Sequence, residues 1–163
     1  MSTIATLVVG ADGSTTKNHR SSGVGSPADR KVFLARRRTC DVIIIGGNTA
    51  RNESYTFTPC PLVVLSRSEL SPLPQNELVH LWNMTPASAL KRAREEFGER
   101  VLIEAGIAII SQLLADALID EFFLSITPEH GGENLIDWRA ILAGFLHVAK
   151  SEVDGTLFFF AHN

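Results

Sequence analysis

Three short glycine-bearing segments follow predicted strands, and their residue types suit a phosphate-rich ligand. They are residues 10–13, 46–51 and 104–106. Glycine lets the backbone approach a pyrophosphate closely, and free N–H groups at a helix N-terminus favour negative charge. None of the segments is a G-x-G-x-x-G or P-loop motif, so each alone also fits ordinary turn chemistry. Together, with a hydroxyl from Thr49 and a carboxylate from Glu104, they predict a ligand site at one edge of a sheet.

The elements that must position these turns are short apolar runs alternating with helical patterns. Continuous apolar runs are typical of strands covered on both faces, and they occur at residues 42–45, 62–65 and 101–103. Ser26-Pro27 and Thr85-Pro86 each combine an N-cap residue with proline at the first helical position. Residues 107–118 carry an apolar stripe at helical spacing. Residues 66–77 read as a surface loop.

The C-terminal third has a different pattern. Residues 122–126 predict a strand, and two further runs, 145–152 and 156–161, flank an Asp-Gly pair that signals a hairpin. The whole predicts an α/β fold, with a mostly parallel central sheet flanked by helices and a C-terminal antiparallel hairpin. Such sheets bind ligands at the carboxyl ends of their parallel strands.

Composition limits the class of protein. A chain of 163 residues predicts one domain over residues 1–163. Fifteen Lys and Arg against eighteen Asp and Glu argue against a nucleic-acid-binding surface. No apolar run approaches the ~20 residues of a membrane span, and the first residues lack signal-peptide features, so we expect a cytoplasmic protein. Cys40 and Cys60 form neither a disulfide framework nor a zinc motif, so no metal site is expected.

Several segments carry a family resemblance. Residues 11–13, 26–33 and 41–51 resemble the pyrimidine reductases of riboflavin biosynthesis, the reductase half of the bifunctional deaminase-reductase. Residues 101–106 resemble the family's Val-Leu-x-Glu-Gly-Gly, and residues 118–122 resemble its Leu-Val-Asp-Glu-Leu. The match spans nearly the whole chain, whereas the zinc signature of the deaminase half is absent.

The resemblance implies a dihydrofolate-reductase-like fold and an NADPH-dependent oxidoreductase. The implied reaction transfers a hydride to the ribosylamino group of a pyrimidine 5′-phosphate, the 5-amino-6-(5-phosphoribosylamino)uracil class of substrate. The resemblance also implies a homodimer. Residues 157–160 could then belong to an interface or to an inner strand.

The resemblance also assigns cofactor-binding residues. Thr49 and Glu53 match positions that contact the NADP moiety, although Thr49 alternatively fits a helix N-cap. Gly106, Ile107 and Ala108 would hold the cofactor's phosphates at a helix start, and Gly46 and Gly47 are further cofactor-binding candidates.

Substrate-facing and catalytic residues follow in the same way. Ser21, Arg37 and Glu104 match positions that face the substrate, and Glu104 and Asp12 are the catalytic candidates, with Asp12 as a polar anchor or a proton relay. Alternatively, Arg37 complements the dipole at a helix C-terminus, and Asp12 is only a turn former. Glu104 follows an apolar strand directly, where a carboxylate is costly to bury without a partner.

The sequence also departs from the family pattern. Ala105 replaces a glycine, residues 53–60 lack the arginine that meets the substrate phosphate in many members, and residues 21–25 lack a common tryptophan. Glu53-Ser54-Tyr55 is closer to branches of the family that have Glu-Gly-Tyr. Two alternatives therefore stay open: a non-catalytic nucleotide-binding relic, or a reductase of another pterin- or pyrimidine-like compound.

Overall fold

The computed structural model describes residues 1–104 and 106–163, which form two compact units. Unit 1 consists of Met1–Ala5 and Arg36–Asp120, and unit 2 of Thr6–Ala35 and Glu121–Asn163. Strand β1 (Ser2–Val9) and helix α1 (Pro27–Arg37) each contribute residues to both units. The single domain over residues 1–163 stays a prediction.

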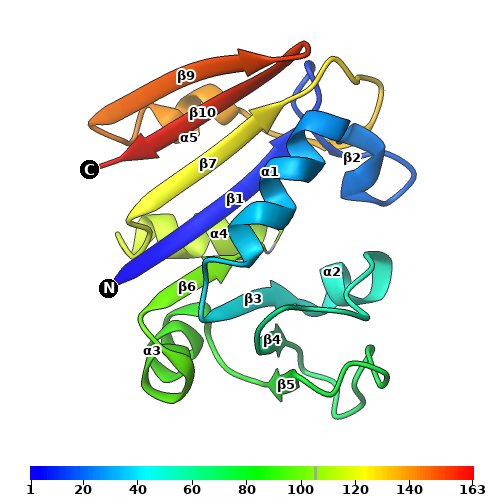
Figure 1. Cartoon of the computed structure of the whole chain (residues 1–163), viewed down its shortest axis with the longest axis vertical. Coiled ribbons are helices and arrows are strands. Elements are labelled where there is room, and N and C mark those ends of the chain that lie inside the picture. Colours follow the sequence, from blue (N-terminus) through cyan, green and yellow to red (C-terminus); the bar gives the residue numbers. More distant parts are fainter. Residues whose placement is uncertain (105) are drawn as a thin grey trace. The chain divides into compact units, whose positions relative to one another are not determined.

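Unit 1 contains the parallel strands (Figure 1). Their order is β5-β4-β3-β6-β1, with the bounds β3 (Val42–Gly46), β4 (Leu62–Leu65), β5 (Val79–Trp82) and β6 (Arg100–Ile103). The apolar runs of β3, β4 and β6 are buried almost throughout, which is typical of parallel strands. The strands predicted from continuous apolar runs are confirmed, and β5 is a half-buried strand that the sequence pattern did not reveal.

Three helices of unit 1 follow these strands. They are α2 (Gly47–Asn52), α3 (Pro86–Phe97) and α4 (Ile107–Ala115). α3 packs on β3, β4 and β6 and beside α4. Its predicted cap is confirmed, since the Thr85 side chain accepts a hydrogen bond from the Ser88 N–H at 3.2 Å. α4 ends at Ala115, earlier than the predicted 118, because Ala117 adopts a left-handed conformation with φ of 53°.

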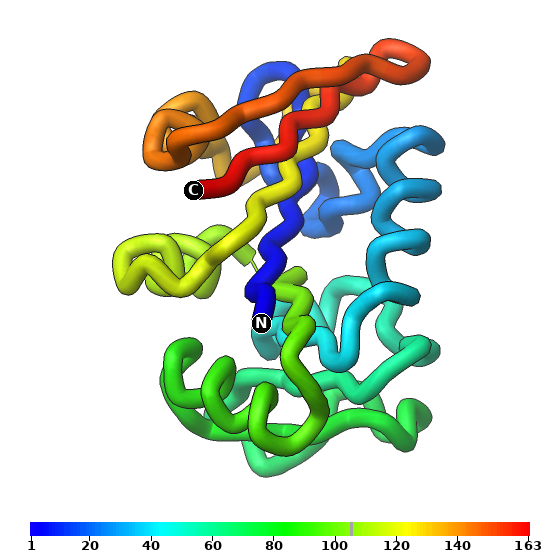
Figure 2. Tube along the Cα trace, turned by 60° about the vertical axis from the view of Figure 1, so that its left-hand side comes forward, coloured from blue at the N-terminus to red at the C-terminus, as the bar shows by residue number. Residues whose placement is uncertain are grey.

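Unit 2 contains the antiparallel strands. β10 (Thr156–His162) pairs with β7 (Glu121–Ile126) on one side and with β9 (His147–Val153) on the other, and Figure 2 shows these three strands side by side. Asp154 and Gly155 form the two-residue turn of the predicted hairpin, with φ of 50° and 79°. The unit also holds a small sheet and two short helices: β2 (Ser14–Thr16), β8 (Glu133–Leu135), η1 (Ser21–Val24) and α5 (Trp138–Leu142).

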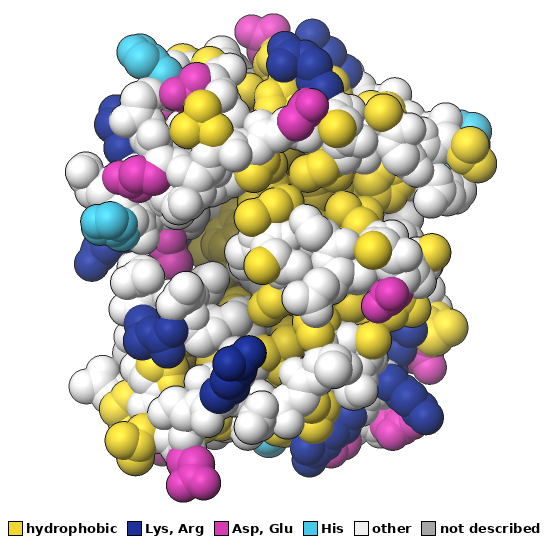
Figure 3. Space-filling model, turned by 180° about the vertical axis from the view of Figure 1, so that it is seen from behind, with side chains coloured by type: hydrophobic (Ala, Val, Ile, Leu, Met, Phe, Trp, Pro, Cys, Tyr) yellow, Lys and Arg dark blue, Asp and Glu magenta, His cyan; other side chains and the backbone are white. Residues whose placement is uncertain are grey.

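The predicted α/β class is thus confirmed, with mostly parallel strands and a C-terminal antiparallel hairpin. Among the described residues, no helix is long and apolar enough to cross a membrane. Within the same residues, no group of three or more His, Cys, Asp or Glu side chains is placed to hold a metal ion. On the face drawn in Figure 3, basic and acidic side chains are dispersed and form no large patch of one sign.

Candidate functional site

Two glycine turns meet at the carboxyl edge of the parallel strands in unit 1. β3 and β6 are adjacent and parallel, with Ile44 opposite Ile103, so the turns that follow them lie at the same edge. Gly46 is the N-cap of α2, and Gly106 is the N-cap of α4. A Cβ atom at Gly46 would lie 3.1 Å from Cδ1 of Ile109 in the first turn of α4. The structure therefore brings the turn after β3 against the first turn of α4.

The N-terminus of α4 is open. Gly106 is exposed, no side chain caps it, and a Cβ built on it would have no atom within 4 Å. The first N–H groups of an α-helix have no partner within the helix, and they carry partial positive charge. Ile107 is half-buried and Ala108 is exposed in this first turn. Ala105, where the sequence departs from the family's glycine, lies outside the described residues.

The turn after β3 also contacts the end of β4. A Cβ at Gly47 would lie 3.2 Å from Nη1 of Arg51 and 3.3 Å from Oγ of Ser66, the residue that follows β4. Thr49 is half-buried within α2, and its carbonyl accepts the N–H of Glu53 at 2.9 Å. The N-cap alternative for Thr49 is wrong, because Gly46 occupies that position. The sequence reasoning missed Ser66, which could have been found as a polar residue directly after a parallel strand.

The same unit contains a buried cluster of three side chains. Arg37 ends α1, Glu104 follows β6, and Tyr55 lies in the segment after α2. Nε of Arg37 donates to both carboxylate oxygens of Glu104, at 2.9 Å and 3.1 Å, and Nη2 donates to Oε2 at 2.7 Å. The hydroxyl of Tyr55 donates to the same Oε2 at 2.7 Å. The expected partner of Glu104 is thus present, and the carboxylate side chain is only 1% exposed.

Burial and hydrogen bonding shift the pKa values of Tyr55 and Arg37 in this cluster. Burial raises the pKa of the Tyr55 phenol well above its ordinary value, and the nearby charge of Glu104 adds to this, so the phenol stays protonated. For Arg37, desolvation lowers the pKa, but the hydrogen bonds and charge of Glu104 outweigh that effect and raise it. The guanidinium also lies 4.6 Å from the centre of the Tyr55 ring.

This arrangement changes the interpretation of two predicted residues. The guanidinium of Arg37 is committed to Glu104, so the helix-dipole alternative does not explain its position. Glu104 holds the end of β6 to α1 and to the segment after α2, and its own N–H donates to the carbonyl of Ile44 at 3.1 Å. The geometry favours a positioning role for the Arg37–Glu104 pair. Contact of Arg37 and Glu104 with a substrate stays a prediction. Tyr55 was not singled out as a site residue, since its partner Glu104 lies 49 positions away.

Asp12 and Ser21 belong to unit 2. Oδ1 of Asp12 accepts the hydroxyl of Ser14 at 2.6 Å and its N–H at 3.1 Å, and Oδ2 accepts the N–H of Gly131 at 2.8 Å. The Ser14 hydroxyl, together with the Gly131 N–H, lowers the pKa of Asp12 to about 2. Asp12 therefore carries a negative charge at neutral pH and ties its turn to Gly131. Its bond to the Ser14 N–H fits the turn-former alternative, and a role for Asp12 at a ligand stays a prediction. Ser21 begins the short helix η1.

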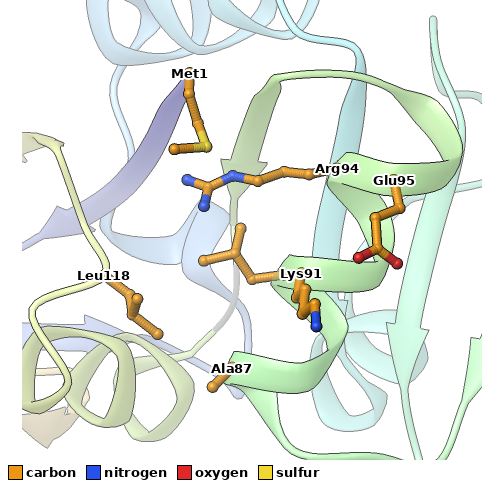
Figure 4. Close-up of a pocket in the computed structure, with 7 residues that line it drawn as sticks. Met1, Ala87, Lys91, Arg94, Glu95 and Leu118 are labelled. Carbon is orange, nitrogen blue, oxygen red and sulfur yellow. The ribbon is translucent and has the colours of Figure 1, made fainter.

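A pocket of about 250 Å³ lies elsewhere in unit 1 (Figure 4). Most of its lining comes from α3, with one residue before β1 and one after α4. The lining residues are Met1, Ala87, Leu90, Lys91, Arg94, Glu95 and Leu118. Arg94 donates to the hydroxyl of Thr3, near the start of β1. The pocket is thus near the amino end of a parallel strand, whereas ligands of such sheets bind at the carboxyl ends.

Comparison with solved structures shows a dihydrofolate-reductase-like fold. Dihydrofolate reductase from Enterococcus faecalis, solved in complex with NADP(H), is 15% identical with a TM-score of 0.72, covering 99% of this chain and 95% of that one. A putative riboflavin biosynthesis protein from Shewanella sp. PV-4 is 19% identical with a TM-score of 0.69, covering 99% and 98%. The Thermotoga maritima deaminase/5-amino-6-(5-phosphoribosylamino)uracil reductase is 16% identical with a TM-score of 0.70, and this chain spans 56% of its length.

The chain therefore has an α/β fold of the dihydrofolate reductase type. The family model of the RibD C-terminal domain matches residues 2–155, so the chain belongs to that family. The predicted family is thereby confirmed. Among curated proteins, none matches the sequence at a significant level.

Proposed function

We propose that the protein is an NADPH-dependent reductase of the pyrimidine reductase type, acting on a pyrimidine ribosylamino phosphate. Family membership and fold support a reductase of this kind. The observation that carries the cofactor proposal is the open N-terminus of α4 at Gly106, beside the Gly46-Gly47 turn. A diphosphate would suit this position, because no side chain caps the helix and a Cβ on Gly106 would meet no atom within 4 Å.

The residues around this turn would hold the cofactor, which supplies a hydride when bound. Gly106, Ile107 and Ala108 would bind the diphosphate through backbone N–H groups, and Thr49 and Glu53 would contact the rest of the nucleotide from α2. The protein's contribution is positioning, with the reacting carbon atoms held about 3–3.5 Å apart. In the proposed reaction the anomeric carbon of the ribosylamino group would gain the hydride as its bond to the ring oxygen breaks, and that oxygen would gain a proton. Asp12 is ionised at neutral pH, so we assign it the anchor role rather than delivery of this proton.

Arg51 and Ser66 support a preference for NADPH over NADH. The guanidinium of Arg51 and the hydroxyl of Ser66 both lie beside the α-carbon of Gly47, at the edge of the glycine turns. A guanidinium and a hydroxyl suit the 2′-phosphate that distinguishes NADPH. Arg51→Ala should raise the KM for NADPH about tenfold and leave the KM for NADH nearly unchanged, as measured by steady-state kinetics. An equal change for both nucleotides would remove Arg51 from this role.

The substrate is proposed on the family relationship. Arg37, Glu104 and Ser21 are proposed to face it, with Arg37 and Glu104 acting through their mutual ion pair as well as by contact. Residues 53–60 contain no arginine, so the phosphate contact found in many family members must come from elsewhere or be absent. This observation favours the second candidate, a family member that binds the nucleotide but reduces another pterin- or pyrimidine-like compound or none.

Binding and turnover should be measured separately to test the proposal. Purified protein is titrated with NADPH by calorimetry, and loss of NADPH absorbance is then followed with the pyrimidine ribosylamino phosphate and with a panel of pterins. Binding with turnover of the pyrimidine supports the proposed reductase. Binding without turnover of any compound favours the relic, and lack of NADPH binding contradicts both.

A further inference from the structure

The pocket beside α3 combines an apolar lining with an excess of positive charge. Its α3 residues follow the helical spacing i, i+3, i+4 and i+7, so they share one face of the helix. They are Ala87, Leu90, Lys91 and Arg94. Lys91 and Arg94 are cations, and Glu95 adds one carboxylate to the described lining. The lining side chains therefore carry a net charge of +1, from two cations less one carboxylate.

The guanidinium of Arg94 is only partly satisfied by the protein. Its side chain is 19% exposed, and its Nε atom is buried without a hydrogen-bond partner among the described residues. Nη2 donates to the hydroxyl of Thr3 and lies 3.8 Å from Oδ2 of Asp120, an oxygen that already accepts the Thr3 N–H. In contrast, Nε and Nη2 of Arg37 both donate to Glu104. Arg94 thus retains positive charge and donor capacity that suit an anion in the pocket.

The arrangement of the lining separates charged from apolar surface. The guanidinium of Arg94 extends from α3 toward Met1, and the side chains of Ala87 and Leu118 lie across the pocket from it (Figure 4). The carboxylate of Glu95 points away from the guanidinium. An anionic group beside Arg94 would therefore avoid the carboxylate of the lining, and an apolar body attached to that group would contact Ala87 and Leu118.

We propose that this pocket binds a small organic monocarboxylate with a short apolar body. A carboxylate matches a guanidinium in shape and charge, and four of the seven described lining residues are apolar. Drug-sized ligands occupy cavities of roughly 300–1,000 Å³, so a cavity of about 250 Å³ suits a smaller molecule such as hexanoate. A net charge of +1 favours one negative charge over the two of a phosphate dianion.

The position of the pocket makes this a second small-molecule site. Met1 precedes β1, and Thr3 near the start of β1 contacts Arg94, whereas the glycine turns follow the carboxyl ends of β3 and β6. β1 and β6 are parallel and paired from Ser2 onward, so the pocket and these turns belong to opposite edges of the parallel strands. The proposal therefore does not depend on the proposed reductase activity.

NMR titration of the full chain tests the class of ligand. Hexanoate should bind with a Kd of about 1 mM or lower and shift the amide signals of α3. Hexanol lacks the charge and inorganic phosphate lacks the apolar body, so each should bind at least about tenfold more weakly. Lack of hexanoate binding at about 10 mM would overturn the proposal. Equal affinity for hexanol or for phosphate would overturn the assigned ligand class.

Substitutions by glutamine on one helix test the location. Arg94→Gln should raise the Kd for hexanoate about tenfold or more, and Lys91→Gln about two- to fivefold. Glu95→Gln should lower it about twofold, because it removes the carboxylate of the lining. Arg92→Gln is the matched control, since Arg92 is outside the described lining and lies 4.2 Å from the Trp82 ring.

Two results of this series would contradict the site. If Arg92→Gln weakens hexanoate binding as much as Lys91→Gln does, only the total charge of the chain matters. Unchanged affinity in both Arg94→Gln and Lys91→Gln would place the ligand elsewhere. Thermal unfolding checks that each variant is folded. Because Arg94 also contacts Thr3, Lys91→Gln at an exposed position decides the test if Arg94→Gln is unfolded.

Discussion

Glu104 and Gly106 are two positions apart in unit 1, but they differ in burial and in hydrogen bonding. At Glu104 the side chain is buried, ion-paired to Arg37 and hydrogen-bonded to Tyr55, and at Gly106 the backbone is exposed and uncapped. The first position has its polar groups satisfied within the protein, and the second offers N–H groups to a ligand. The carboxylate of Glu104 thus joins three segments of unit 1, and the exposed backbone at Gly106 is where we propose that the diphosphate binds.

Among the substitutions that test this comparison, removal of the Glu104 charge should change the unfolding free energy most. Glu104→Gln leaves the guanidinium of Arg37 buried without a counter-ion, which should cost about 3–5 kcal/mol of unfolding free energy, measured in denaturant. The matched control is Glu96→Gln, which breaks the exposed Arg92–Glu96 pair and should cost less than about 1 kcal/mol. Equal losses in the two variants would mean that burial does not distinguish these ion pairs.

Tyr55→Phe should have the next largest effect, because it removes one hydrogen bond to the charged carboxylate and leaves the ring in place. We expect a loss of about 1.5–3 kcal/mol of unfolding free energy. NADPH affinity should change little, because the hydroxyl points into the cluster. A strong loss of NADPH affinity at unchanged stability would instead place Tyr55 in the ligand site.

The open end is tested by Gly106→Ala. The added methyl group meets no protein atom within 4 Å, so the unfolding free energy should stay the same or rise slightly. If a diphosphate approaches this backbone, the Kd for NADPH should rise about tenfold, which corresponds to roughly 1.4 kcal/mol. Gly25→Ala is the control, since its Cβ would make only ordinary contacts from 3.5 Å outward. Unchanged NADPH affinity would place the diphosphate elsewhere.

Asp12 is an exposed carboxylate, in contrast to Glu104. We expect its substitution to change the stability of the fold least. Its pKa is lowered in the folded protein, so its hydrogen bonds stabilise the fold fully above the ordinary carboxyl range and lose this effect as the pH falls toward about 2. Asp12→Asn should therefore be less stable than the wild type at neutral pH and equally stable near pH 2. Thermal unfolding over this pH range measures the difference, and a pH-independent gap would contradict the explanation.

The sequence predicted those parts of the fold that depend on local signals. Continuous apolar runs located β3, β4 and β6, the Thr85-Pro86 pair located the start of α3, and the Asp-Gly pair located the hairpin. β5 was missed because Val79-His80-Leu81-Trp82 is short and interrupted by a polar residue. α2 was missed because glycine and asparagine are weak helix formers, so tertiary contacts decide its conformation.

The candidate site was predictable only in part, because some of its contacts join residues that are far apart in the sequence. The glycine turns were recognisable because each follows its strand directly. The contact between Arg37 and Glu104 joins residues 67 positions apart, and no local pattern reports it. The family resemblance placed both residues at the substrate, but it did not show that they bind each other.

The proximity of Glu104 to Gly106 has a kinetic consequence. Because the carboxylate is held by donors from two other segments, the end of β6 is fixed in place. If the cofactor binds beside it as proposed, this part of the backbone would lose little conformational entropy on binding. Differences in affinity among variants of the proposed site should then appear mainly as differences in dissociation rate.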